Sequence, residues 1–418
     1  MILYTGNPFV DVGLAIAANI GNQASLSNIS SDDLSKAVKF LHSHVDSLKS
    51  LKVLSEFWVN NPFMGINPEQ KPKYDRFLKD LGDQTLASRS GYCQICGQSP
   101  VVGETDRCWF PLAAGGDSDP CTLPGLRGKT ICASCLSAVV ILPLGCRSCK
   151  DGAYFIHVAE PDLQVQAVAE GVTTIRIALA KKAGEGIKHG TALSGRIALL
   201  EIISGSDLWD HTQPGHMEQI PRGGATIISF TNRGNGPKFN ELHLPAEALE
   251  FFSELATVRL REYFAEWVRK VQKFTNDNKR KDIGDQLCND VEGRRSLAPL
   301  FRAMKKPYID RHPGERAHLQ KEELQMLEIY EDIALRKKNR FDALQRIAVR
   351  VNEMPQSYRD SFVKRLGSTG TKEGILGLFK EYCKRKRLAV TSEELRAIDS
   401  SNASEAISLL YLLCNAEE

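Results

Sequence analysis

The stretches Cys93-Gln-Ile-Cys96-Gly97 and Cys132-Ala-Ser-Cys135 decide how the first part of this 418-residue chain folds. Two Cys-x-x-Cys pairs that come together commonly close four thiolates around a tetrahedral zinc ion. Gly97 follows its pair directly, where a tight metal-binding turn favours glycine. Cys132 and Cys135 open an apolar stretch that can begin as a helix, and the positive end of a helix stabilises thiolates. The sequence therefore predicts a structural zinc site of the treble-clef type on these four cysteines.

The remaining cysteines of this region leave alternatives open. A third pair, Cys146-Arg-Ser-Cys149, can replace either of the first two pairs. It can also join Cys108 and Cys121 in a second site, and a chain without bound metal is the third possibility. Eight of the 11 cysteines fall between residues 91 and 150, which suits a metal site in a reducing cytoplasm better than a disulfide framework.

Two observations argue against catalysis. A closed site of four cysteines has no open metal position for a substrate or water. Residues 97–131 contain no histidine, although the His-Asn-His nucleases carry their catalytic histidines between two such pairs. The nine histidines elsewhere, His157 among them, do not converge in sequence. The chain also lacks the phosphate-loop, nucleophile-elbow and dinucleotide-binding motifs, so we expect no enzyme.

Charge is unevenly distributed along the chain. Residues 1–250 sum to about −3, residues 251–390 to about +11 and residues 391–418 to about −5, for a total of +3. Clustered lysine and arginine follow a phosphate backbone with little sequence preference, and solvated helix faces are the alternative interpretation. The candidate backbone contacts in the basic segment are Arg336, Lys337, Lys338, Lys384, Arg385, Lys386 and Arg387.

The periodicity predicts an α+β fold. Residues 1–90 indicate helices, the first of them with Asn7 as N-cap and Pro8 at its first position. Within residues 151–245, four short runs predict strands, at 165–168, 174–178, 197–203 and 226–230.

An apolar stripe predicts one long helix over residues 246–275. Residues 301–418 indicate an all-α bundle, in which Thr391-Ser-Glu-Glu394 contains a capping box. We therefore expect an α+β domain over residues 1–300, with the zinc-binding island at 91–150, and a C-terminal helical bundle over 301–418.

No targeting segment is visible. The first residues lack a basic region, and Asp11 interrupts their apolar stretch. The longest apolar run, residues 136–145, is too short to span a bilayer. We expect a cytoplasmic protein without a membrane partner.

The opening Tyr4-Thr-Gly-Asn-Pro-Phe-Val-Asp-Val-Gly13 resembles the N-terminus of the large subunit of type I-B CRISPR surveillance complexes, known as Cascade. Three later features keep the order of that family. They are the two Cys-x-x-Cys pairs, then Leu142-Pro-Leu-Gly145, then Phe230-Thr-Asn-Arg-Gly-Asn-Gly-Pro237 before Leu244-Pro245 and a helix. The resemblance spans roughly residues 1–270, and the pair Cys146/Cys149 is not part of the family pattern.

The resemblance implies a non-catalytic subunit that recognises the protospacer-adjacent motif in duplex DNA and promotes unwinding and R-loop formation, while guide pairing reads the target. The C-terminal bundle resembles the Cascade small subunit and would contact the displaced strand. The implied partners are the guide CRISPR RNA, target double-stranded DNA, the backbone and small subunits, and a recruited helicase-nuclease or, in transposon-associated systems, a transposition adaptor.

Candidate DNA contacts in the first part of the chain lie in three places. Asn7 carries an amide that can read a base edge, although the local signal for a helix cap is complete without DNA. A basic loop contains Lys181, Lys182 and Lys188, and a glycine-rich loop contains Asn232, Arg233 and Asn235. Two alternatives to the Cascade assignment remain: a stand-alone zinc-ribbon nucleic-acid-binding protein and a metal-dependent nuclease.

Overall fold

The computed structural model of the chain describes residues 4–51, 54, 57–58, 63, 68–104, 109, 130–181, 193–209, 219–231, 238–277, 283–311, 320–369, 371–385, 388–399 and 403–416. The chain divides into two compact units, Met1–Ala246 and Glu247–Glu418. Within the described residues the first unit combines helices with antiparallel strands, and the second contains helices alone. The fold is α+β, as the sequence predicts.

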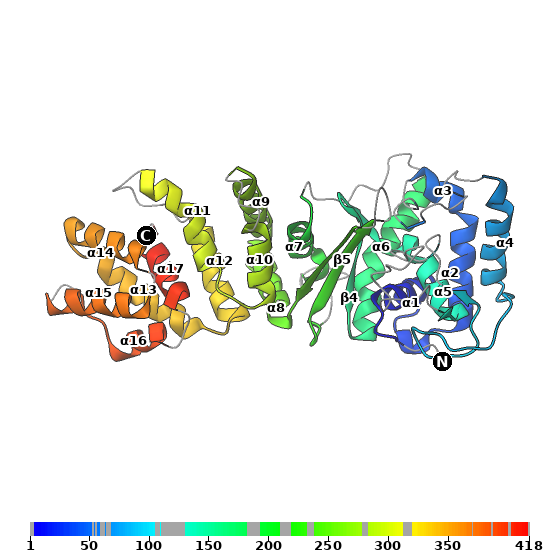
Figure 1. Ribbon diagram of the computed structural model, residues 1–418, viewed down its shortest axis with the longest axis horizontal. Helices are drawn as coiled ribbons and strands as arrows, with labels where there is room; N and C mark the ends of the chain where they lie inside the picture. The colour runs from blue at the N-terminus through cyan, green and yellow to red at the C-terminus, as the bar shows by residue number, and fades with distance from the viewer. Residues whose placement is uncertain are drawn as a thin grey trace. The chain divides into compact units, whose positions relative to one another are not determined.

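The first unit begins with helices and ends with a sheet (Figure 1). Its elements are α1 (Pro8–Ile20), η1 (Leu26–Asn28), α2 (Ser31–Ser43), α3 (Val45–Ser50), η4 (Pro68–Gln70), α4 (Lys71–Gly82), β1 (Gly103–Glu104), β2 (Thr130–Ile131), α5 (Ala133–Val140), η5 (Leu142–Leu144), β3 (Arg147–Cys149), β4 (Gly152–Val158), α6 (Pro161–Lys181), α7 (Arg196–Ser204), η6 (Asp207–Trp209), β5 (Ala225–Thr231) and β6 (Lys238–Leu244).

Helix α1 lies at the centre of the first unit. The Asn7 side chain accepts hydrogen bonds from the amides of Phe9, at 3.1 Å, and Val10, at 3.2 Å, and Pro8 occupies the first helical position. The predicted cap is confirmed. The helix is buried over most of its length and packs against α2, α5 and α6. One contact is unusually close, because a Cβ atom added to Gly13 would lie 2.0 Å from the carbonyl oxygen of Ala138 in α5.

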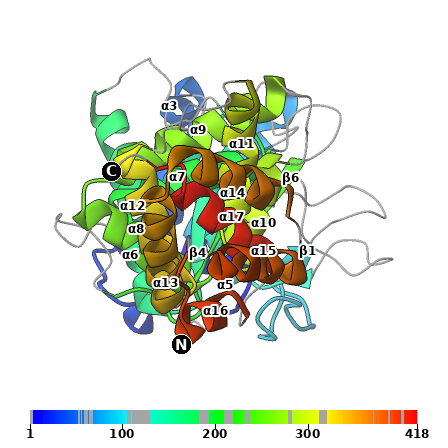
Figure 2. The ribbon, with the colours of Figure 1, turned by 90° about the vertical axis from the view of Figure 1, so that its left-hand side faces the viewer.

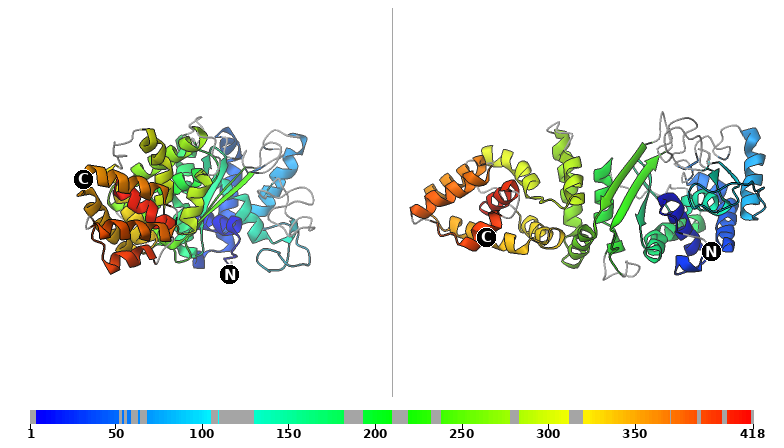
Figure 3. Two further views of the ribbon diagram at one scale, coloured as in Figure 1. Left: turned by 60° about the vertical axis from the view of Figure 1, so that its left-hand side comes forward. Right: turned by 60° about the horizontal axis from the view of Figure 1, so that its bottom comes forward.

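Four antiparallel strands in the order β3-β4-β5-β6 form the sheet. Figures 1 and 3 show its long green strands, β5 and β6, side by side. Phe9 of α1 packs edge-on against Phe155 of β4, at 5.3 Å between ring centroids, and against Phe230 of β5, at 5.5 Å. Helices α1 and α6 therefore cover one face, and α7 contacts β5 and β6 from the other. The predicted strand at 226–230 is confirmed as part of β5.

Three predicted strands are wrong. Residues 165–168 and 174–178 belong to α6, and residues 197–203 belong to α7. Short runs of valine and isoleucine fit both a buried strand and a buried helix. Residues 161–181 form a helix because their buried side chains recur every three or four residues, which places them on one face against α1. Helix α7 is buried on most sides, so no polar face reveals its period.

The second unit is a helical assembly. Its elements are α8 (Ala246–Thr257), α9 (Arg261–Asp277), α10 (Ile283–Glu292), α11 (Ala298–Arg311), α12 (Lys321–Ile329), the π-helical turn η7 (Tyr330–Ala334), α13 (Lys338–Asn352), α14 (Gln356–Ser368), α15 (Lys372–Lys384), α16 (Ser392–Asp399) and α17 (Ala403–Leu413). Figure 2 shows α17 enclosed by its neighbours, and it packs against α11, α13, α14, α15 and α16.

Two boundaries differ from those predicted. The expected long helix over 246–275 is two helices, because Arg259 between them adopts a left-handed φ of 62°. The expected domain boundary at 300/301 falls inside α11. Trp267 of α9 stacks on Phe301 of α11 at 4.3 Å, so the helices after Ala246 share a core with the C-terminal bundle.

The Gly13 contact yields a stability prediction. Changing Gly13→Ala places a methyl group against backbone that side-chain motion cannot relieve, and we expect a loss of about 1–3 kcal/mol in the free energy of unfolding. The matched control is Gly377→Ala in α15, where a Cβ meets nothing within 4 Å; it should gain about 0.5–1 kcal/mol. Thermal and urea unfolding measure both, and equal stabilities for the two variants would contradict the close packing.

Candidate functional site

Four cysteines from two distant segments form one cluster. The Sγ atoms of Cys93, Cys96, Cys132 and Cys135 all lie within 4.8 Å of one another, and those of Cys96 and Cys132 are 3.6 Å apart. Tetrahedral coordination with zinc–sulfur bonds of about 2.3 Å separates the sulfurs by about 3.8 Å. The four cysteines are close enough to bind one metal ion, and their spacing is compatible with zinc.

A tight turn supplies the first two thiols. Gly97 has a left-handed φ of 74°, and its amide donates to the carbonyl of Cys93 at 2.8 Å. The Cys93 amide donates in turn to the carbonyl of Gln98 at 2.7 Å. A side chain at position 97 would strain this backbone, so the glycine holds both thiols on one side of the turn.

A short strand pair and a helix start supply the other two thiols. Strand β1 pairs with β2 through Gly103 and Ile131, directly before Cys132. Cys132 is the N-cap residue of α5, and Cys135 lies in its first turn. The predicted helix start is confirmed. The positive end of the helix dipole therefore faces the side of the cluster where negative charge would collect.

Hydrogen bonding within the cluster favours a bound cation. The thiols of Cys132 and Cys135 donate to the Cys93 sulfur and hold the pKa of Cys93 far below its usual range. The same hydrogen bonds, to Cys132 and Cys93, together with burial, raise the pKa of Cys135 far above its usual range. Several thiolates this close together would repel one another. A divalent ion removes that repulsion.

The third Cys-x-x-Cys pair has a different structure. Residues Arg147–Cys149 form β3, where Cys149 pairs with Gly152, so the pair is extended rather than turned. Cys146 is buried in the apolar core, and burial raises the pKa of its thiol above the usual range. Among the described residues, the four-cysteine cluster is the sole group of His, Cys, Asp or Glu side chains close enough to hold a metal. Cys108 and Cys121 lie outside the described residues.

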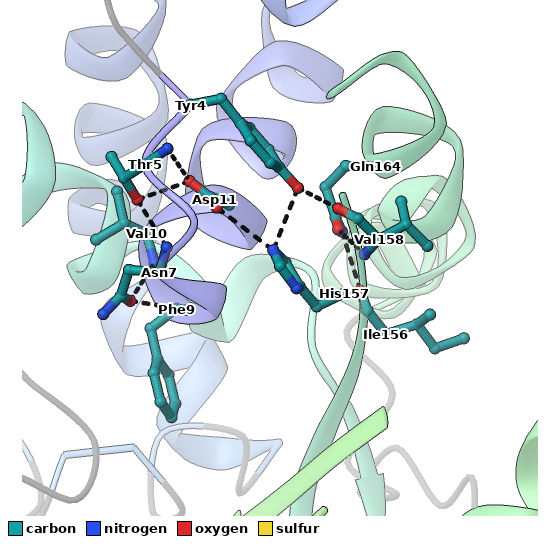
Figure 4. Close-up of polar contacts among 10 residues, drawn as sticks. All are labelled: Tyr4, Thr5, Asn7, Phe9, Val10, Asp11, Ile156, His157, Val158 and Gln164. Carbon is teal, nitrogen blue, oxygen red and sulfur yellow. Dashed lines mark hydrogen bonds and ion pairs between the residues drawn. The ribbon is translucent and has the colours of Figure 1, made fainter. Parts of the chain in front are cut away.

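A second polar group surrounds the N-terminus of α1 (Figure 4). Asp11 is fully buried and accepts hydrogen bonds from the amide of Thr5, at 2.7 Å, and from its hydroxyl, at 2.8 Å. His157 Nε2 of β4 lies 3.3 Å from Asp11 Oδ2 and 3.2 Å from the Tyr4 hydroxyl. Burial, together with the charges of Asp11 and Glu160, raises the pKa of Tyr4 well above its usual range. These contacts fix the segment that carries Asn7.

Sequence reasoning missed this network. His157 has no other histidine near it in sequence, and 146 positions separate it from Asp11. No local pattern links two such residues, since β4 and α1 meet only in the folded unit. The cap at Asn7 is the one local sequence pattern in this region. It predicts the start of α1, but it gives no information about the contact with His157.

Several predicted DNA contacts lie outside the described residues. These are Lys182, Lys188, Asn232, Arg233, Asn235, Lys386 and Arg387. Lys181 is the exposed last residue of α6. Lys384 ends α15 and is exposed, and Arg385 follows it.

Three of the candidate contacts in the second unit take part in exposed ion pairs. Arg336 pairs with Glu250, Lys338 with Asp332 at 3.6 Å, and Arg385 with Glu381 at 3.0 Å. These pairs are exposed, and exposed pairs contribute about 1 kcal/mol or less, so phosphate can compete for the cations.

Lys337 has a second, internal role. It lies 3.5 Å from Glu405, a carboxylate that also binds the buried guanidinium of Arg340 at 2.9 Å. Arg340 binds buried Glu331 as well. Lys337 therefore belongs in part to the internal ion network of the bundle, and removing it should affect stability as well as any binding of phosphate.

Comparison with protein-family models, with curated proteins and with solved structures gave no significant match to this chain. Within the described residues, no helix combines the length and the apolar character needed to cross a bilayer.

The cluster makes a prediction about metal content. The purified chain should contain about one zinc ion per chain, and Cys96→Ser or Cys135→Ser should remove most of it, because three thiolates hold zinc far more weakly than four. The ion should also be released as pH falls, since each ligand must lose its proton to bind. Elemental analysis of protein dialysed at stepwise lower pH measures both effects.

The matched control for the metal prediction is Cys149→Ser, which removes a thiol of the extended third pair. It should keep a full complement of zinc. Loss of zinc in this variant, or its retention in Cys96→Ser, would place the metal elsewhere.

Proposed function

We propose that this chain is the non-catalytic large subunit of a type I-B Cascade complex. It recognises the protospacer-adjacent motif in duplex DNA and promotes R-loop formation, with its C-terminal bundle along the displaced strand. A structural zinc ion in a treble clef formed by Cys93, Cys96, Cys132 and Cys135 holds the N-terminal unit in shape. A stand-alone zinc-ribbon nucleic-acid-binding protein is the competing possibility.

The observation that carries the proposal is that sequence motifs far apart along the chain contact one another in the first unit. The pairs Cys93/Cys96 and Cys132/Cys135 meet in a single cluster. Helix α5, which starts at that cluster, packs against Gly13 of α1 through Ala138. The N-terminal motif, the cysteine pairs and the segment around Phe230 are the features that resemble the family, and Phe9 of the first contacts Phe230 of the last.

The geometry of Asn7 allows it to cap a helix and to bind DNA at the same time. Its Oδ1 atom accepts both capping hydrogen bonds. The Nδ2 group is left as a donor, and the residue is half-buried rather than enclosed. Gly6 beside it has a φ of 76° and open space at its Cβ position, so another molecule can approach the backbone here. An amide donor at a helix N-terminus suits a base edge or a phosphate.

Reconstitution tests the assignment. The chain is expressed with candidate type I-B backbone subunits and a guide RNA, and the complex is assayed on a duplex library with randomised bases beside the target. We expect co-purification and selection of one short motif. Replacing Asn7→Asp should lower binding of target duplex about 10-fold or more, because the carboxylate retains the cap but loses the donor and repels phosphate.

Stability measurements separate the two roles of Asn7. Asn7→Asp should melt at or above the temperature of the unaltered chain, since a carboxylate at a helix N-terminus is favourable by about 0.3–1 kcal/mol. Asn7→Ala should lose about 1 kcal/mol with the cap. A chain that stays monomeric and never joins the guide complex would overturn the Cascade assignment. Wild-type DNA binding by Asn7→Asp would remove Asn7 from the interface.

A further inference from the structure

We propose that Tyr92 is a stacking platform for one unpaired base of a single-stranded nucleic acid, presented by the cysteine turn that follows it. This inference rests on the nucleic-acid-binding role proposed above and adds to it a site on the metal-binding turn itself. Nothing in the resemblance or in the sequence patterns assigns a role to this residue.

The exposure of the ring is the first observation. Tyr92 is 74% exposed, against 52% for Val349, 48% for Ile177 and 42% for Phe239, the other exposed large hydrophobic side chains among the described residues. The next residue, Cys93, is 2% exposed. The chain therefore passes from solvent to core within one residue, and the tyrosine ring contributes little packing to the fold.

The rigidity of the backbone under the ring is the second observation. The Tyr92 carbonyl accepts a hydrogen bond from the Thr130 hydroxyl at 2.8 Å, and the Gln94 amide donates to the Thr130 carbonyl at 2.9 Å. Cys93 belongs to the thiol cluster. The segment is held on both sides of Tyr92, so a ligand that stacks on the ring need not order the backbone first.

The composition of the segment that carries the ring favours a nucleic acid. Between Asp83 and Glu104 the sole charged residue is Arg89, and the rest of this segment is polar or apolar without a carboxylate. Arg89 is exposed and is held by paired backbone hydrogen bonds with Val101, at 2.8 and 3.2 Å. An exposed aromatic ring three residues from an exposed cation, in a segment without carboxylates, suits a single strand, through base stacking and phosphate contact.

A protein partner fits these observations less well. Stable protein interfaces bury about 800 Å² on each side and depend on several apolar side chains together. Tyr92 is the one large apolar side chain of the described segment 68–104 that is strongly exposed. The single exposed ring of Tyr92 has about the area needed to stack on one base.

The experiment uses the zinc-loaded full-length chain and two fluorescent oligonucleotides of equal length. One is a mixed-sequence single-stranded DNA, and the other has the same phosphodiester backbone with abasic sites throughout. We expect Tyr92→Ala to weaken binding of the base-bearing strand roughly 5- to 150-fold and to leave binding of the abasic strand unchanged. Tyr92→Phe should bind like the unaltered chain, because the ring face remains.

Controls distinguish a lost contact from a lost fold. Tyr92→Ala should keep its zinc and its melting temperature, and Ile177→Ala, an exposed apolar residue of α6, should bind both strands normally. If the chain binds the base-bearing strand and Tyr92→Ala binds it equally well, the stacking site is wrong while the proposed function stands. A defect of Tyr92→Ala confined to assembly with the backbone subunits would make the ring a protein contact and overturn the site. Failure of the unaltered chain to bind either strand would overturn the stacking site, whereas the proposed function stands or falls on duplex binding by the reconstituted complex.

Discussion

The convergence of four thiols is the constraint on which the first unit depends. It joins a turn at residues 93–97 to the start of α5, across 36 positions between Cys96 and Cys132. An apolar core alone gives no reason for four polarisable, acidic groups to meet, whereas a divalent ion does. Helix α5 then transmits this constraint, because its backbone at Ala138 lies directly against Gly13 of α1. Two kinds of contact thus position the N-terminal end of α1, which follows Asn7. One is the packing of α1 against α5, and the other is the hydrogen-bond network of Asp11.

The second unit follows a different principle. Its described residues are held together by aromatic packing, such as Trp267 on Phe301, and by a buried ion network centred on Arg340. Breaking one member of such a network leaves an uncompensated buried charge, which costs about 3–5 kcal/mol. Glu331 of this network lies in a π-helical turn, and π turns often mark functional positions. We therefore expect the two units to respond to different conditions: the first to metal and proton concentration, the second to changes in its internal charges.

Features encoded by neighbouring residues could be predicted from the sequence. The Asn7 cap, the helix start at Cys132 and the capping box between Thr391 and Glu394 all depend on residues within a few positions, and all three are present. Features that depend on distant segments could not. In α6, short runs of β-branched residues favour strands, so the helix could not be recognised from them. In β3, the Cys-x-x-Cys spacing suggests a metal-binding turn, although the segment is a strand. Spacing identified the four-cysteine cluster because glycine follows one pair and a helix follows the other.

The most direct test of this account is hydrogen exchange along the chain before and after the metal is removed by a chelator. If the thiol cluster organises the first unit, chelation lowers the protection of amides in α5 first and in α1 next, while the amides of α8–α17 keep theirs. Unchanged protection in both α5 and α1 after complete removal of the metal would contradict the account, because the fold of the first unit would then stand without its central constraint.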